Sequence, residues 1–203
     1  MKPVLLSLVG RKGAGKSEVL EALIALLKEK GLRIGVMKHL AREDFEIDQP
    51  GKDTYRYRMQ GAETVMLLGR KRRAIFSDFP VESDWEENLK IFEGFDLVFL
   101  EGYFLKAIPM VEVYKQGAGD PLLAKMENVF AVCSDIPTGI PVPHFSQGQL
   151  EGLASLIALS LRKYISACPF NDGRRPEEKS QSLEISQSPL SGLLRNDIEV
   201  GSQ

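Results

Sequence analysis

Continuous apolar runs alternate with helical stripes along the first 168 residues of the chain. The apolar runs, which are typical of strands buried on both faces of a sheet, occupy residues 3–9, 32–37, 96–100 and 129–133. Apolar side chains recur three or four positions apart at residues 17–30 and 150–164, which predicts helices. Strands joined by long crossovers pair in parallel, so the pattern predicts an α/β fold with a mostly parallel sheet flanked by helices.

Two segments depart from this alternation. Short β-like runs at residues 63–68 and 73–77 surround a basic turn, which predicts a β-hairpin inserted in the sheet at about 63–77. The turn, Arg70 to Arg73, is either a solvated charge run or an anion-binding patch. Residues 169–203 are rich in Ser, Gln and Pro and have no apolar period, so we expect a domain over 1–168 and a disordered tail.

Charge and composition exclude several classes of protein. The 26 basic and 28 acidic residues give a net charge of −2, which argues against a general nucleic-acid binder. Two cysteines and two histidines are too few for a disulfide scaffold, a four-cysteine zinc site or a His-rich metal site. The first apolar run is too short for a signal peptide or a membrane span, so we expect a cytoplasmic protein without a membrane partner.

The segment after the first strand is a complete G-x-x-x-x-G-K-[ST] motif. It consists of Gly10, Arg11, Lys12, Gly13, Ala14, Gly15, Lys16 and Ser17. Its place between a strand and a helix is the context in which such a loop binds phosphates through backbone N–H groups and the helix N-terminus. We expect Lys16 to reach the β- and γ-phosphates and Ser17 to bind Mg²⁺, which predicts a P-loop nucleotide-binding domain over residues 1–168.

An acidic residue at the end of a neighbouring strand is expected to complete the magnesium site. Asp96 opens the third apolar run and Glu101 closes it. Ligands of parallel sheets bind at the carboxyl ends of the strands, so we expect Glu101 near the metal and Asp96 at the far end as a strand-start cap.

Candidate residues also follow the second strand. Lys38 and His39 end that strand, and we expect them beside the phosphate loop, where either could contact an anion. Asp48 lies in a Pro-Gly turn and is either an Mg²⁺ or water ligand or a plain turn residue. Lys52 could meet a phosphate or anionic substrate, and Asp53 is predicted to cap a helix over 54–60.

Together these motifs resemble the MobB family of molybdopterin-guanine dinucleotide biosynthesis adapter proteins. The resemblance is carried by the phosphate loop, the Lys38-His39 pair, the D-x-P-G-K-D-T stretch within residues 45–56, the Gly-Ala pair at 61–62 and the run 96–103. It covers roughly residues 3 to 165.

The resemblance implies a GTP-binding P-loop protein with weak GTPase activity. Such a protein assists the guanylyltransferase that attaches GMP to molybdopterin, so GTP, that enzyme and the molybdopterin cofactor are the implied partners, with Mg²⁺ as cofactor. Lys16, Asp48 and Glu101 would be the catalytic residues, and Ser17, Asp48 and Glu101 would hold the metal. The family is dimeric, which suits a hairpin with a free edge.

Recognition of guanine is the least specific part of the pattern. No Asn-Lys-x-Asp run is present, and Asp135, after the strand at 129–133, could accept the guanine N1 and N2 hydrogens or be a turn residue. The main alternative function is a small-molecule kinase with the same loop. A metallochaperone GTPase and a non-hydrolysing scaffold are further alternatives.

Overall fold

The computed structural model describes residues 2–40, 46–77, 85–103, 105, 107–117, 121 and 128–167. The predicted tail at 169–203 lies outside these residues. The chain divides into two compact units. We call Met1–His39 with Phe92–Gln203 the core unit, and Leu40–Ile91 the insert unit.

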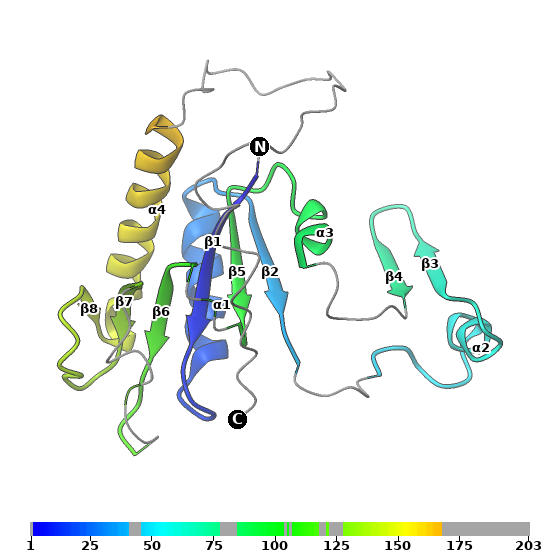
Figure 1. Ribbon diagram of the computed structural model, residues 1–203, viewed down its shortest axis with the longest axis horizontal. Coiled ribbons are helices and arrows are strands. Elements are labelled where there is room, and N and C mark those ends of the chain that lie inside the picture. The colour runs from blue at the N-terminus through cyan, green and yellow to red at the C-terminus, as the bar shows by residue number, and fades with distance from the viewer. Residues whose placement is uncertain are drawn as a thin grey trace. The chain divides into compact units, whose positions relative to one another are not determined.

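The core unit contains a six-stranded sheet in the order β2-β5-β1-β6-β7-β8 (Figure 1). Its strands are β1 (Val4–Val9), β2 (Ile34–Lys38), β5 (Leu97–Glu101), β6 (Met110–Val113), β7 (Val129–Cys133) and β8 (His144–Phe145). Every neighbouring pair in the sheet is parallel. The carboxyl ends of the six strands therefore lie along one edge, as the sequence predicts for an α/β fold.

Two long helices share one hydrophobic core with this sheet. They are α1 (Lys16–Glu29) and α4 (Leu150–Ala167), the latter preceded by the short 3₁₀ helix η1 (Gln147–Gln149). Leu23 of α1 and Leu153 of α4 are fully buried in the same cluster as Leu8 and Phe99 of the sheet. Burial of a leucine or phenylalanine side chain contributes about 1.5–3 kcal/mol, so this cluster is what holds the helices on the sheet.

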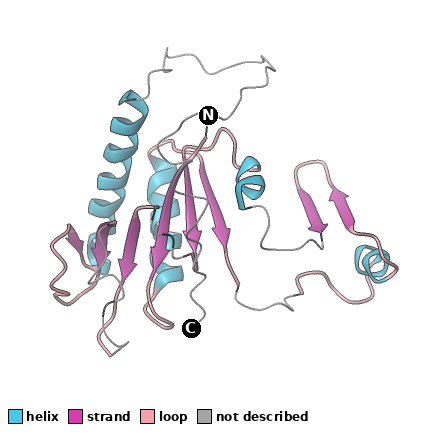
Figure 2. Ribbon diagram, in the orientation of Figure 1, coloured by secondary structure: helices cyan, strands magenta, loops and turns pink. Residues whose placement is uncertain are grey.

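The insert unit contains α2 (Asp53–Met59), β3 (Thr64–Leu68), β4 (Arg73–Ser77) and α3 (Trp85–Lys90) (Figure 2). The predicted hairpin is present, and its two strands are antiparallel with Val65 opposite Phe76. It was expected within the main sheet, but among the described residues β3 and β4 pair only with each other. Asp53 was expected to cap α2, but it is the first helical residue, and the backbone of Lys52 takes the capping position.

One central strand was not predicted. β6 pairs with β1 on one side and β7 on the other, yet it has only four residues, and Glu112 interrupts its apolar run. A run this short with an acidic residue carries no strand signal of its own, because its burial comes from its neighbours in the sheet. Within the described residues, no helix is long and apolar enough to span a lipid bilayer.

Candidate functional site

The phosphate loop joins the end of β1 to the start of α1, as predicted. Gly10 follows Val9 directly and has φ +151°, a conformation that side chains rarely adopt. A Cβ at this position would lie 2.2 Å from the carbonyl oxygen of Val113 in β6. Gly10 thus lets the backbone leave β1 and pass against β6, which brings the loop to the carboxyl edge of the sheet.

The helix that follows the loop begins without a side-chain cap. Gly15 is the N-cap residue of α1, with φ +90° and no side chain to accept a backbone hydrogen. The N–H groups of the first helical turn have no acceptor within the helix, and the helix dipole makes this end positive. An anion such as a phosphate can therefore accept hydrogen bonds from the first turn of α1.

Lys16 lies over the loop. Its ammonium donates hydrogen bonds to the carbonyl oxygens of Gly10, at 2.7 Å, and Arg11, at 2.9 Å. Partial burial lowers the pKa of Lys16, an effect that Glu101 opposes and Lys38 adds to. An ammonium has three donors, so a phosphate in the loop can accept the third and restore the solvation that burial removes.

Glu101, Lys38 and His39 gather at the same edge of the sheet. Lys38, at the end of β2, is opposite Glu101 in the strand register, and its Nζ lies 3.1 Å from Glu101 Oε1. The Glu101 side chain is only 13% exposed. The ring of His39 packs at 5.3 Å from that of Tyr103, whose pKa is raised by burial. The structure thus brings the predicted acid, lysine and histidine together.

The two acidic residues of β5 have different surroundings. Asp96, before the start of the strand, accepts a 2.6 Å hydrogen bond from the backbone N–H of Arg33. This bond is at the amino end of the sheet, opposite the phosphate loop. Of the two acids, Glu101 is therefore the one at the carboxyl edge, where the sequence placed it.

The remaining predicted residues belong to two different units. Asp48 and Lys52 belong to the insert unit, where both line a cavity described below, and a magnesium role for Asp48 stays a prediction. Asp135, after β7, accepts a 3.1 Å hydrogen bond from the backbone N–H of Gln147. It holds the start of η1, and its contact with guanine likewise stays a prediction.

Comparison with known proteins identifies the family. The model of molybdopterin guanine dinucleotide synthesis protein B (MobB) matches residues 5–135. The molybdopterin-guanine dinucleotide biosynthesis adapter protein of Escherichia coli is 30% identical over 78% of this chain and 94% of its own length. The corresponding protein of Haemophilus influenzae is 32% identical, over 67% of this chain and 77% of its own length. The chain belongs to the MobB family.

Solved MobB structures share the fold. The crystal structure of Bacillus subtilis MobB has a TM-score of 0.60 with this chain at 22% identity and covers 78% of this chain and 97% of its own. The MobB family match at 5–135 includes the phosphate loop, Glu101 and Asp48, whereas α4 lies beyond it. The candidate site thus falls within the part of the chain that defines the family.

Two residues near the phosphate loop of this MobB protein were not predicted from the sequence. Glu112 is 1% exposed and lies opposite Val9, the last residue before the loop. An acidic residue within an apolar run could have marked Glu112 as a candidate, but the run was too short to be predicted as a strand. Gln147 could not be predicted as a neighbour of the loop, because it is far from Gly15 in the sequence. The tertiary fold brings its side-chain amide within 3.2 Å of a Cβ placed on Gly15.

Proposed function

We propose that this protein binds GTP with Mg²⁺ at the phosphate loop and hydrolyses it slowly. Its main role is that of an adapter, which assists the guanylyltransferase that joins GMP to molybdopterin. The names of the related adapter proteins support the adapter role, and the glycine loop supports nucleotide binding. A glycine loop that ends at an uncapped helix, with the ammonium of Lys16 above it, carries the proposal.

Each part of the loop has one task. The backbone N–H groups and the first turn of α1 bind the phosphate oxygens and fix their orientation. Lys16 neutralises charge on the β- and γ-phosphates. Lys38 and His39, at the adjacent strand end, can contact a terminal phosphate or another anion. These contacts hold the terminal phosphate in one orientation, so that a water molecule can attack it directly. Hydrolysis then needs no covalent intermediate with the protein.

The residues at the loop fit a magnesium ion. Ser17 supplies a hydroxyl and Glu101 a carboxylate, and both are the hard oxygen ligands that Mg²⁺ prefers. Mg²⁺ on a nucleotide takes most of its ligands from phosphates and water, so one or two protein oxygens suffice. When bound, the ion neutralises charge on the phosphates. The ion pair with Lys38 involves Oε1 of Glu101, so a metal ion can take the second carboxylate oxygen without breaking that pair.

A nucleotide titration tests this function. We expect GTP and GDP with Mg²⁺ to bind the full-length protein more tightly than ATP. Asp135 can accept two adjacent N–H groups from guanine, whereas the adenine edge donates only one and places a ring nitrogen without a hydrogen beside it. Isothermal calorimetry gives the three affinities. Preference for ATP would overturn the proposal in favour of a kinase.

Replacing Glu101 tests the magnesium site. Glu101→Gln should lower Mg²⁺-dependent GTP hydrolysis by about tenfold or more while changing nucleotide affinity less, because even the loss of an outer-shell partner of a metal costs about 10–100-fold in metal affinity or activity. Phosphate release and calorimetry measure the two effects. Asp96→Asn, at the other end of the same strand, is the matched control and should leave hydrolysis unchanged. Loss of hydrolysis in the control alone would exchange the roles of the two acids.

We further propose that the protein is a homodimer through the hairpin. Met66, Leu68 and Ile75 alternate onto one face of the two strands, and they are 50%, 71% and 45% exposed. A two-stranded hairpin is marginal alone, and its unpaired edges favour association. A second copy would cover this face through a two-fold symmetric contact.

A charge on that face should separate the copies. We expect Met66→Asp to shift the protein from dimer to monomer, with at least about a tenfold weaker association, because the new carboxylate would be desolvated at the interface. Light scattering over a concentration series measures the mass. Met59→Asp makes the same change at a methionine of α2 with similar exposure, 55%, and should remain dimeric. A monomeric wild-type protein would refute the interface.

A further inference from the structure

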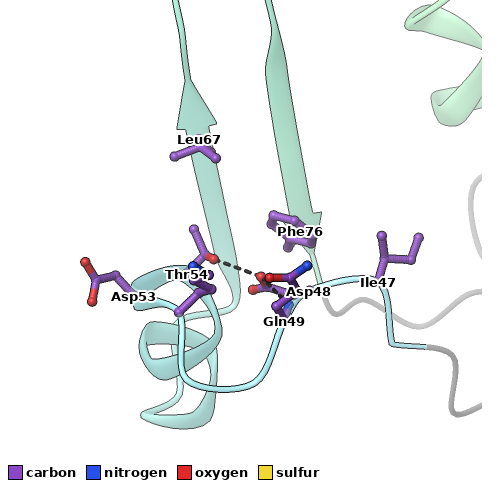
Figure 3. Close-up of a pocket in the computed structure, with 8 residues that line it drawn as sticks. Ile47, Asp48, Gln49, Asp53, Thr54, Leu67 and Phe76 are labelled. Atoms are coloured by element: carbon purple, nitrogen blue, oxygen red, sulfur yellow. Dashed lines mark hydrogen bonds between the residues drawn. The ribbon is translucent and has the colours of Figure 1, made fainter.

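The insert unit contains a cavity of about 390 Å³. It is formed by the loop before α2, the first turn of that helix and one face of the hairpin (Figure 3). Leu67 and Phe76 supply its apolar wall, and Asp48, Lys52 and Thr54 supply polar groups. An apolar wall with a few convergent polar groups is the usual composition of a small-molecule site.

Asp48, on the lining of this cavity, has a carboxylate oxygen without a hydrogen-bond donor. The residue is only 9% exposed. Its Oδ1 accepts hydrogen bonds from the backbone N–H of Gln49 and the hydroxyl of Thr54, both at 2.9 Å. Its Oδ2 is buried and has no hydrogen-bond partner among the described residues. A buried carboxylate oxygen without a donor is unfavourable, so a ligand that donates to it would be bound strongly.

The position of Asp48 is set before any ligand arrives. Its backbone N–H donates to Glu46 Oε1 at 3.0 Å, and Arg58 donates to the same oxygen at 3.0 Å. The Arg58 hydrogen bond is the main reason that the pKa of Glu46 is lowered, which keeps this pair charged. The Arg58 guanidinium also lies 5.9 Å from the ring centre of Phe76. These contacts tie the Asp48 loop to α2 and to the wall of the cavity.

The unpartnered oxygen of Asp48 favours a ligand that donates two hydrogen bonds from neighbouring N–H groups. A carboxylate offers about four acceptor positions. Two are taken at Oδ1, and both that remain are on Oδ2. A ring carbon that bears an amino group next to a ring N–H presents two adjacent N–H groups that point the same way, and one oxygen placed between them can accept from both. A flat ring of this kind would also cover Phe76 and the exposed Leu67.

We propose that this cavity binds the 2-amino-4-oxopyrimidine edge of a pterin or a guanine, with Asp48 Oδ2 as the acceptor. The inference rests on the proposed function, because a pathway that joins a pterin to a guanine nucleotide supplies both rings. Lys52, on the lining of the cavity, adds a positive charge for a phosphate on either molecule. The proposed contacts are hydrogen bonds from the ring to Asp48, which need no metal ion.

Ligands without phosphates test this site apart from the phosphate loop. We would titrate the full-length protein with 6-hydroxymethylpterin, followed by its fluorescence, and with guanosine, followed by calorimetry. Adenosine is the control ligand, since its amino group adjoins a ring nitrogen that has no hydrogen. We expect one or both of the first two to bind at least about tenfold more tightly than adenosine. The ligand that binds identifies the source of the ring.

Variants of the cavity decide the role of Asp48. Asp48→Asn should weaken ring binding by about tenfold or more, because the amide no longer offers a charged acceptor. Asp53→Asn, at an exposed acid on the same lining, is the matched control and should change it less than about twofold. Leu67→Trp fills the cavity from an exposed position and should block binding, which tests the site even if Asp48→Asn does not fold.

The outcomes separate this inference from the proposed function. Absence of pterin and guanosine binding, equal binding of adenosine, a need for Mg²⁺, or unchanged binding in Asp48→Asn would each overturn the cavity assignment. Lys16→Ala should retain ring binding, since the probes have no phosphate. Ring binding without any GTP binding would refute the proposed GTP function and leave the cavity assignment standing.

Discussion

Replacing Lys16 with alanine is expected to weaken GTP–Mg²⁺ binding by about 100-fold or more. The ammonium lies over the loop, bonded to the carbonyl oxygens of Gly10 and Arg11, and it is partly buried. Its removal takes the positive charge from the place where the β- and γ-phosphates bind. Calorimetric titration of the variant measures the loss.

Two further measurements make the Lys16 result specific. Lys28→Ala removes the same charge from the exposed end of the same helix and should leave GTP affinity within about twofold of wild type. Thermal unfolding of Lys16→Ala should remain cooperative, because the lysine packs little of the hydrophobic core. Wild-type affinity for GTP in Lys16→Ala would show that the loop is not the nucleotide site.

Gly10→Ala should lower the free energy of unfolding by about 3 kcal/mol or more. Its Cβ would stand 2.2 Å from the carbonyl oxygen of Val113, and its φ of +151° is strained for alanine. The strand β6 or the loop must move to make room, and β6 is a central strand of the sheet. Urea unfolding followed by circular dichroism measures the change.

Gly13→Ala separates the cost of a positive φ from the cost of the steric clash with β6. Gly13 also has a positive φ, +80°, but nothing lies within 4 Å of a Cβ placed on it. Alanine there should cost only the conformational term, about 1 kcal/mol. Equal destabilisation by the two substitutions would show that contact with β6 does not determine the conformation of the loop.

The fold was largely predictable where the chain carries its own signal. The apolar runs ending at Val9, Leu100 and Cys133 were long enough to be predicted as strands, and α1 and α4 had clear helical stripes. β6 and the two-residue β8 were not predictable, because their stability comes from neighbouring strands rather than from their own residues. The hairpin was predicted, but its separation from the main sheet was not.

The position of the glycine loop was predictable because its residues are contiguous. A loop from Gly10 to Ser17 between a strand and a helix fixes its own geometry, and the strand-end rule was enough to choose Glu101 over Asp96. The ion pair between Lys38 and Glu101 required the order of the sheet, because it joins two strands far apart in sequence.

The sequence by itself therefore determined most of the elements and the place of the glycine loop between a strand and a helix, since these depend on local spacing and residue type. The tertiary structure alone decided which strands are neighbours, that Glu112 is buried beside Val9, and that Asp48 keeps a carboxylate oxygen without a partner. The physical reason is that burial and hydrogen-bond pairing depend on contacts between distant segments, for which no local pattern exists.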